Sequence, residues 1–385
     1  MDRDARIYIA GHTGLVGSAL LQRLSTGGYS KLIVRTHEAL DLTRQAQVES
    51  FFEKQSPEYV FVAAAKVGGI QANKTYPAEF IYENLSIQNN VIHSAWKTQV
   101  KRLLFLGSSC IYPRECPQPM KEEHLLSGSL ESTNEPYAVA KIAGVEMCQS
   151  YNTQYGTNFI SLMPTNLYGS NDNYDLETSH VLPALIRKFH LAKLASQGDW
   201  EAISKDEHHY GQIPDDILKF LASISKSRGY YPSILDSSPS RADQAPPKVV
   251  IWGSGSPRRE FLHVNDLADC CIFLMNLEEG IFRSMIADNR LPLVNVGWGE
   301  DISIKELAFL IRDIVGYDGE IIFDDTRPDG TLRKLLDISK LTSLNWSPQI
   351  SLKQGVVKTY QWYKQILHKG RSEKKLAVSS VAKPS

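Results

Sequence analysis

The chain has 385 residues, of which 42% are hydrophobic and 22% are charged, and its formal net charge is −1. This is the composition of a globular protein long enough for two domains, and it gives no support for a basic nucleic-acid-binding protein. No run of about 18 apolar residues occurs, and the first residues lack the apolar core of a signal peptide. We therefore expect a cytoplasmic protein with no nucleic acid or membrane partner.

The first motif is "RIYIAGHTGLVGSALLQRL", where an apolar strand over Ile7–Ala10 leads into a helical pattern. Between them stand Gly11, Gly14 and Gly17. Glycines at this spacing permit a tight strand-to-helix turn and let backbone N–H groups approach a pyrophosphate at the helix N-terminus. The motif predicts a dinucleotide-binding loop, with a ligand-free turn as the alternative.

The next strand, "KLIVRT", ends near Arg35, with His37 two residues on. Enzymes that use NAD usually carry an acidic residue here to bind the ribose 2′-hydroxyl. A guanidinium suits a 2′-phosphate instead, so the sequence favours NADP(H). The alternative is that Arg35 is a solvated strand end.

Two more apolar runs, Tyr59–Ala65 and "RLLFLGSS", alternate with helical segments such as "ENLSIQNNVIHSAWKTQ". Near-continuous apolar strands between helices are typical of a parallel sheet buried on both faces. The predicted fold class is α/β, a Rossmann-type doubly wound parallel sheet with helices on both faces and a smaller α/β domain. Ligands bind at the carboxyl ends of such strands, which is where Ser108, Ser109 and Cys110 fall.

A helical segment, "NEPYAVAKIAGVEMCQSYN", places Tyr137 and Lys141 four residues apart and therefore on one face. An ammonium near a phenol favours the phenolate, so Lys141 is expected to lower the pKa of Tyr137. Ser108 can hold a substrate carbonyl whose oxygen exchanges a proton with Tyr137. These three residues predict a carbonyl oxidoreductase.

The nucleotide loop, the strand-end serine and the Tyr–Lys pair together resemble the extended short-chain dehydrogenase/reductase family. Further agreement comes from "AAAKVGGI", "NKTYPAEFIYEN", "LGSSCIYP", "MPTNLYG" and "WGSGSPRREFLHV". The resemblance runs from about residue 5 to 365. It implies an NADP(H) site made by two groups of residues. The first is Gly11, His12, Thr13, Gly14, Leu15, Val16, Gly17, Arg35 and His37; the second is Leu106, Gly107, Ser108, Ser109, Lys141, Pro164, Thr165, Asn166, Leu167 and His180.

The same motifs resemble those family members that convert GDP-4-keto-6-deoxy-D-mannose to GDP-L-fucose. The resemblance implies 3,5-epimerisation by the acid–base pair Cys110 and His180, followed by reduction of the 4-keto group by NADPH. Ser108, Tyr137 and Lys141 would serve the reduction. The implied substrate-binding residues are Lys188, Trp252, Arg259 and Asp329. The family also suggests a homodimer through helices near residues 84–98 and 136–154.

Three features depart from better-known relatives. Thr13 and His37 stand where those relatives have basic residues, which weakens the preference for NADP(H), and Lys188 replaces an arginine. An insert occupies residues 194–247. Its Pro214 precedes a short amphipathic helix, and the rest is expected to be a surface loop. Asp206, Glu207, His208 and His209 could bind a metal, but a solvated loop is favoured and no metal is expected.

The remaining segments continue the α/β pattern. A helix is expected from Asn265 or Asp266, and Cys270 and Cys271 are expected to pack in the core because they lie in its apolar run. The five cysteines have no CxxC spacing and predict neither a disulfide nor a zinc site. "LPLVNVG" predicts a strand. "SIKELAFLIRDIVG" predicts a helix with a capping box at Ser303 and Glu306 and an end at Gly316.

The expected domains are an NADP-binding domain over residues 1–170, to which about 260–300 returns, and a substrate domain over 171–259 and 301–365. Residues 366–385 are expected to be a disordered tail.

Two rival enzymes and one non-enzyme remain as alternatives. A sugar-nucleotide 4,6-dehydratase needs carboxylates at the strand end, and "SSCIYP" has none. A 4-epimerase has no use for a Cys/His pair. A protein that only binds NADP has no need of the Ser, Tyr and Lys set.

Overall fold

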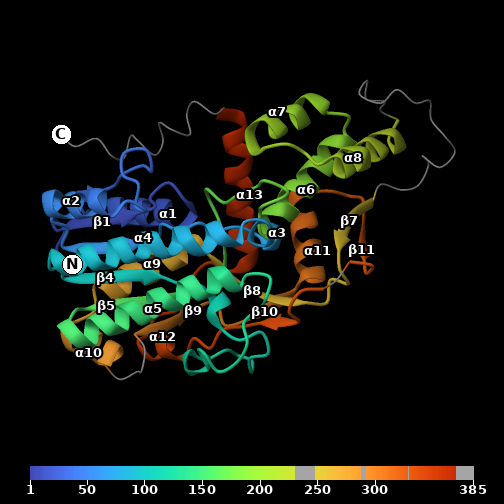
Figure 1. Ribbon diagram of the computed structural model, residues 1–385. Coiled ribbons are helices and arrows are strands. Elements are labelled where there is room, and N and C mark those ends of the chain that lie inside the picture. Colours follow the sequence, from blue (N-terminus) through green and yellow to red (C-terminus); the bar gives the residue numbers. More distant parts are fainter. Residues whose placement is uncertain (230–247, 288–291, 328, 370–385) are drawn as a thin grey trace.

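The central element of the fold is a parallel sheet (Figure 1). The computed structural model describes residues 1–229, 248–287, 292–327 and 329–369. The sheet has six strands in the order β2-β1-β3-β4-β5-β9. They are β1 (Arg6–Ala10), β2 (Lys31–Ile33), β3 (Tyr59–Val62), β4 (Arg102–Leu106), β5 (Phe159–Pro164) and β9 (Leu293–Val296). The last strand comes from far along the chain and pairs with β5 in parallel.

Helices cover both faces of this sheet. On one face α2 (Gln45–Gln55), α4 (Pro77–Lys97) and α5 (Glu135–Tyr155) share a hydrophobic core with the strands. On the other face α1 (Leu15–Thr26), α9 (Val264–Met275) and α10 (Glu279–Ala287) form a second core. Every residue of β4 and β5 is buried, which explains why both sequences are apolar apart from Arg102 and Ser161. The predicted doubly wound fold is confirmed.

A smaller region lies beyond the carboxyl ends of these strands. It has β6 (Asn166–Tyr168), β7 (Lys248–Trp252), β8 (Arg258–His263), β10 (Asp301–Ser303), β11 (Glu320–Asp324) and β12 (Arg333–Lys334). Strand β8 pairs with β6, β10 and β12, while β7 and β11 pair with each other in parallel. The helices are α6 (Val181–Ser196), α7 (Trp200–Tyr210), α8 (Asp215–Ser227), α11 (Ile304–Val315) and α13 (Leu352–Lys369). They pack around a third core.

Short helical turns complete the described chain: α3 (Ile70–Thr75), α12 (Ser339–Ser343) and two 3₁₀ turns at Ser109–Ile111 and Glu122–His124. No helix within the described ranges is long and apolar enough to cross a membrane.

The helix ends test the sequence-based expectations. The capping box at Ser303 and Glu306 is confirmed, and Gly316 ends α11 in the left-handed conformation with φ 75°. The predicted start of α9 at Asn265 or Asp266 was wrong, because the helix begins at Val264. Its N-cap residue is His263, whose Nδ1 accepts a hydrogen bond from Asn265 N at 3.2 Å. Cys270 and Cys271 are buried in the core as expected.

The insert is the largest correction. Residues 200–210 form α7 rather than a surface loop, because Asp206 is fully buried and its Oδ1 accepts a hydrogen bond from Arg187 Nε at 2.7 Å. The expected helix after Pro214 is confirmed as α8. No metal-binding cluster occurs among the residues described. The rest of the insert, residues 230–247, lies outside the described residues.

The expected tail also begins later than residue 366, because α13 continues to Lys369. Residues 370–385 lie outside the described part of the chain.

Candidate active site

The glycine loop between β1 and α1 has the shape of a dinucleotide cradle. Gly11 has φ +82°, and a Cβ there would lie 2.7 Å from the backbone of Ala64. A Cβ on Gly17 would lie 2.1 Å from Gly11 O, so α1 can approach the loop this closely only with glycine. The helix N-terminus at Gly14 has no side-chain cap, which leaves its backbone N–H groups for a ligand. The loop therefore fits a pyrophosphate.

His12 and Arg35 lie at the edge of this loop. His12 is buried, and its Nδ1 has no hydrogen-bond partner among the described residues. Burial lowers the pKa of His12, and a hydrogen bond to the backbone of Arg35 partly opposes this lowering. The exposed Arg35 guanidinium donates from Nη1 to Val34 O at 2.7 Å and lies 5.5 Å from the Phe51 ring centroid. Its remaining N–H groups can meet a phosphate.

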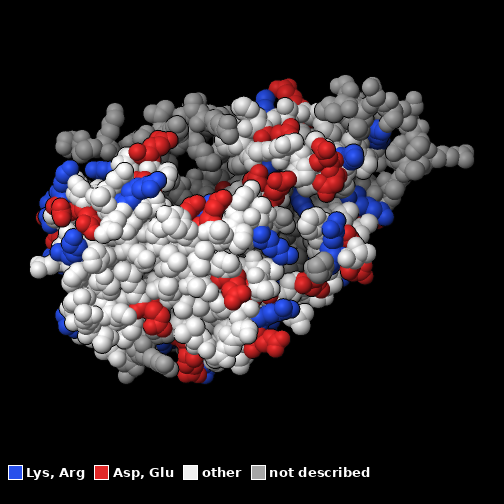
Figure 2. Space-filling model, viewed as in Figure 1, with Lys and Arg blue, Asp and Glu red and all other residues white. Residues whose placement is uncertain are grey.

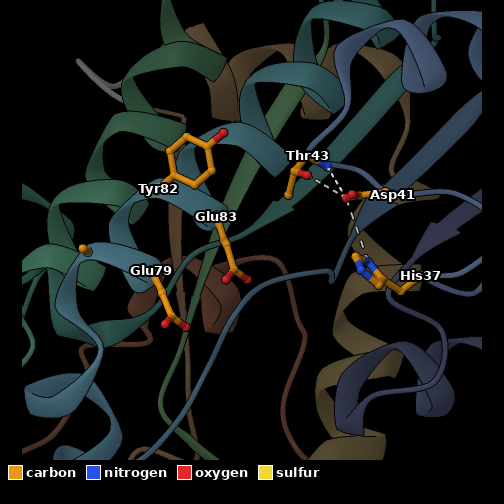
Figure 3. A pocket seen from close by; sticks show the side chains of 7 residues that line it. His37, Asp41, Thr43, Glu79, Tyr82 and Glu83 are labelled. Atoms are coloured by element: carbon orange, nitrogen blue, oxygen red, sulfur yellow. Dashed lines mark hydrogen bonds and ion pairs between the residues drawn. The ribbon is translucent and has the colours of Figure 1, made fainter.

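His37 has a different environment (Figure 3). It lines a cavity of about 500 Å³ between the loop after β2 and helix α4, together with Asp41, Glu79, Tyr82 and Glu83. Its Nδ1 lies 4.0 Å from Asp41 Oδ1, which also accepts hydrogen bonds from Thr43. Because this cavity is lined by carboxylates, it does not favour a phosphate, and Arg35 is the better candidate for one.

Ser108, Tyr137 and Lys141 meet where β4 ends. The Ser108 side chain makes a hydrogen bond with Tyr137 and also accepts one from Cys110 N at 3.3 Å. Lys141 Nζ donates to Leu106 O at 2.8 Å and lies 5.8 Å from the Tyr137 ring centroid. Phe80 of α4 packs edge-on against the Tyr137 ring, at 6.2 Å between centroids. The phenol is thus held from both sides at the carboxyl edge of the sheet.

The electrostatics of this pair differ from the expectation. Burial raises the pKa of Tyr137, with the charge of Cys110 adding to the rise and the Ser108 hydrogen bond opposing it. Burial also lowers the pKa of Lys141 to about 7. The expected lowering of the Tyr137 pKa by Lys141 was wrong, because the Lys141 side chain is desolvated and donates its hydrogen bond to a backbone carbonyl. A phenol held protonated is the form that can donate a proton.

Cys110 lies in the turn after β4, directly beside Ser108. Its Sγ accepts a hydrogen bond from Asn134 Nδ2 at 3.2 Å. Asn134 is the N-cap residue of α5, the helix that carries Tyr137. The thiol is partly exposed, so a substrate held by Ser108 and Tyr137 could reach it.

His180 is the N-cap residue of α6. Its side chain is exposed, yet it has enough protein around it for desolvation to lower its pKa. Exposure combined with desolvation is typical of the wall of a cleft. In the described part of the chain no hydrogen bond links His180 to Cys110, and the neutral ring is the dominant form at pH 7.

The segment Pro164–Leu167 crosses from β5 to β6 at the same edge of the sheet. Thr165 Oγ1 and Asn166 Nδ2 both donate to Glu260 O, at 3.2 and 2.9 Å. The Glu260 carboxylate is buried and accepts from Gly299 N at 2.7 Å and Leu336 N at 3.1 Å. Strand β8 therefore fixes the segment that was predicted to line the nicotinamide.

The four predicted substrate residues lie in the smaller region. Lys188 of α6 has its Nζ 5.8 Å from the ring centroid of Trp252, which is 61% exposed at the end of β7 and is therefore not a core residue. Arg259 of β8 donates from Nη1 to Thr331 O at 2.6 Å. Asp329 exerts a charge effect on Arg259, and its Oδ1 and Oδ2 accept from Ser254 N and Oγ at 2.9 and 2.7 Å.

Sequence reasoning missed three residues at the site. Asn134 binds Cys110, Glu260 anchors Thr165 and Asn166, and Arg327 lies 4.9 Å from the Trp252 ring centroid. The position of Asn134 directly before the helix start was a usable signal, since asparagine is a common N-cap residue. Nothing in the sequence indicated the other two.

A glycine cradle at the edge of a parallel sheet, with a Ser–Tyr–Lys set at the next strand ends, defines an oxidoreductase of the short-chain dehydrogenase/reductase class. The chain belongs to the NAD dependent epimerase/dehydratase family, which matches residues 7–204 and 228–283. The unmatched residues 205–227 include all of α8.

Individual relatives are similar over nearly the whole chain. GDP-L-fucose synthase 1 of Arabidopsis thaliana is 49% identical and covers 94% of this chain and 94% of its own. GDP-L-fucose synthase of Escherichia coli (strain K12) is 45% identical, and the match covers 93% of this chain and 96% of that protein. A crystal structure of a GDP-D-glycero-L-gluco-heptose synthase from Campylobacter jejuni, in the presence of NADPH, is 42% identical, with a TM-score of 0.80 and coverage of 94% and 99%.

Proposed function

We propose that this protein is a GDP-L-fucose synthase that uses NADP(H). It would convert GDP-4-keto-6-deoxy-D-mannose to GDP-L-fucose by epimerisation at C3 and C5 and then reduction at C4. The observation that carries the proposal is the position of Cys110, bonded to Asn134 and adjacent to Ser108 and Tyr137. A plain ketoreductase does not need a thiol there. Relatives named GDP-L-fucose synthase support the substrate.

The epimerisation follows from the chemistry of the ketone. A carbonyl at C4 acidifies the hydrogens at C3 and C5, and Ser108 and Tyr137 stabilise the enolate oxygen by hydrogen bonds. At each carbon one group removes the proton and another returns a proton to the opposite face. Cys110 and His180 are our candidates, because His180 is held neutral by desolvation and can accept or pass on a proton.

The reduction uses the same carbonyl-holding groups. Bound NADPH supplies the hydride to C4. Tyr137 then donates its proton to the new alkoxide, which its raised pKa favours by keeping the phenol protonated beforehand. Lys141 holds the strand end through its hydrogen bond to Leu106 O. Thr165 and Asn166, fixed by Glu260, would border the nicotinamide.

A second candidate is a synthase acting on a GDP-linked keto-heptose. It is favoured by the Campylobacter jejuni heptose synthase, whose identity to this chain is close to that of the fucose synthases. This enzyme and the first candidate share the GDP moiety and differ in the sugar.

The deciding experiment offers both sugars to the purified protein with NADPH. We expect NADPH oxidation with GDP-4-keto-6-deoxy-D-mannose at a far higher kcat/KM than with a GDP-4-keto-heptose, and NMR of the product should show the L-fuco configuration. Preference for the heptose, or a product with unchanged C3 and C5, would reject the fucose synthase in favour of the second candidate or a simple reductase.

We further propose a homodimer through α4 and α5 that works in the cytoplasm. Few charged side chains lie over these two helices (Figure 2), and Tyr82, Val139 and Tyr155 are large exposed apolar residues on them. All five cysteines are free thiols, in keeping with a reducing compartment. Sedimentation with a charged substitution at Val139 tests the dimer.

A further inference from the structure

We propose that Asp175 is a positioning residue for His180, and that the end of α7, inside the insert, holds Asp175 in place. The inference rests on the proposed function, because it takes His180 to be one of the two groups that exchange protons at C3 and C5. It gives a role to an aspartate outside the predicted site and to a part of the insert, residues 205–227, that the family match does not include.

The Asp175 carboxylate organises the turn that leads directly into His180. Its Oδ1 accepts hydrogen bonds from Glu177 N at 3.1 Å, from Thr178 N at 2.9 Å and from Thr178 Oγ1 at 2.8 Å. Ser179 N donates to Asp175 O at 2.9 Å. Each of the three residues before His180 is therefore bonded to Asp175, which restricts the backbone that carries the imidazole.

The same turn is bonded to the loop after β3. Gly69, the N-cap residue of α3, donates from its N–H to Thr178 O at 2.9 Å. A Cβ on Gly69 would lie 3.0 Å from Ser179 O and 3.2 Å from Thr178 O, so glycine permits this close approach. The direction of Thr178 O depends on the bonds that Thr178 gives to Asp175. Asp175 and Gly69 thus fix one residue from two sides.

The insert contacts Asp175 at the end of α7. Gly211 is the C-cap residue of this helix, and a Cβ there would lie 2.8 Å from Asp175 Oδ2. Arg187 connects the two segments, because it donates to Tyr174 O at 3.1 Å and to Gly211 O at 2.6 Å. One oxygen of Asp175 therefore receives the bonds of the turn, while the other lies against the insert.

His180 depends on this segment for its place. It is the N-cap residue of α6, and within the described chain its side chain makes no capping hydrogen bond to the helix. The ring position is therefore set by the backbone before it. Proton transfer needs heavy atoms about 2.6–3.2 Å apart, and a displacement of about 1 Å can cost about 100-fold in rate.

The first test is an NMR titration of the His180 ring without substrate, with its signal identified by its loss in His180→Gln. Desolvation lowers the pKa of His180. A displaced ring regains water, so Asp175→Ala should raise this pKa toward its ordinary value. Asp175→Asn should keep the wild-type pKa, because its amide oxygen can accept the same three bonds. Both variants remove the charge, and the difference between them isolates the hydrogen bonds.

The second test is turnover in D₂O by the same proteins. Asp175→Ala should slow deuterium incorporation at C3 and C5 by about 10- to 100-fold. Hydride transfer to a ketone that needs no epimerisation should be retained, and Asp175→Asn should restore most of the exchange. Asp199→Ala is the matched control, since Asp199 also accepts from a backbone N–H, that of Ala202 at 3.0 Å, but lies at the opposite end of α7.

The outcomes separate the inference from the proposed function. An unchanged His180 pKa and unchanged exchange in Asp175→Ala would overturn the inference and leave the function intact. An equal loss of hydride transfer would also overturn it, because Asp175 would then support the fold rather than His180.

Two outcomes would reach further. If His180→Gln exchanged deuterium as fast as the wild type, the assignment of His180 would fail together with the inference. If the wild type incorporated no deuterium at C3 and C5, the proposed epimerisation itself would fail.

Discussion

Asn134 Nδ2 donates a hydrogen bond to Cys110 Sγ at 3.2 Å. Asn134 is also the N-cap residue of α5, three residues before Tyr137. One helix terminus therefore positions both the thiol proposed for epimerisation and the phenol proposed for reduction. The two chemistries are joined through this contact, and it is the first place where they can be separated by mutation.

Asn134→Asp should weaken the proposed epimerisation selectively. A carboxylate in place of the amide loses the donor and repels the thiolate, so alkylation of Cys110 by iodoacetamide at pH 7 should slow by about tenfold. Deuterium exchange at C3 and C5 should slow in parallel, while single-turnover NADPH oxidation on a ketone that needs no epimerisation is retained. An unchanged alkylation rate would contradict the role of Asn134.

Tyr137→Phe should weaken the proposed reduction at C4. Removing the proton donor should reduce NADPH oxidation by about 100-fold or more, with exchange at C3 and C5 less affected because Ser108 still holds the carbonyl. Tyr155→Phe serves as the control, since Tyr155 lies exposed at the far end of the same helix. Equal losses in both variants would point to damage to α5 rather than to a lost proton donor.

Asp172 predicts a pH dependence of stability. Burial raises its pKa to about 7, against the opposing hydrogen bonds from the backbone of Asn173 and Gly169. An unfolded aspartate titrates near pH 4, so between about pH 4 and 7 the folded state keeps a proton that the unfolded chain releases. The free energy of unfolding should therefore fall as pH rises through this window.

Asp172→Asn removes this titration. Its stability advantage over the wild type should grow by about 1–4 kcal/mol between pH 4 and pH 8, as measured by urea unfolding. An advantage that does not change with pH would show that Asp172 is not the titrating group.

The buried pair of Arg187 and Asp206 predicts how the insert is held. Both side chains are fully buried, and Arg187 also donates to Gly211 O at 2.6 Å and to Tyr174 O at 3.1 Å. Arg187→Met should destabilise the protein by about 3–5 kcal/mol, because the buried Asp206 carboxylate loses its cationic partner and keeps only the hydrogen bond from the Tyr363 hydroxyl.

Adding Asp206→Leu should recover part of this loss. As a control, Arg228→Met removes the exposed pair with Asp318 and should cost no more than about 1 kcal/mol. A small effect of Arg187→Met would mean that the insert is not fixed through this pair.

Much of the main sheet and the reaction centre could be predicted because the signals there are local. Gly11 and Gly17 are required by backbone contacts within one turn, and Tyr137 and Lys141 share a helix face by spacing alone. The cap at Ser303 is likewise set within four residues.

The failures have a different cause. The polar run around Asp206 looked solvated because its partner, Arg187, comes from another helix and was not visible in a pattern of single residues. Arg327 reaches Trp252 only through the pairing of β7 with β11, and the pKa of Tyr137 depends on burial. Each of these depends on tertiary contacts that a single sequence does not reveal.

The central claim is that one site performs both epimerisation and reduction. The most direct test is turnover of GDP-4-keto-6-deoxy-D-mannose with NADPH in D₂O, by the wild-type protein and by Cys110→Ser. We predict GDP-L-fucose with deuterium at C3 and C5 from the wild type and strongly reduced formation by the variant. NADPH oxidation that gives a product without deuterium at these carbons would contradict the account and leave a 4-ketoreductase in which Cys110 and His180 have no catalytic part.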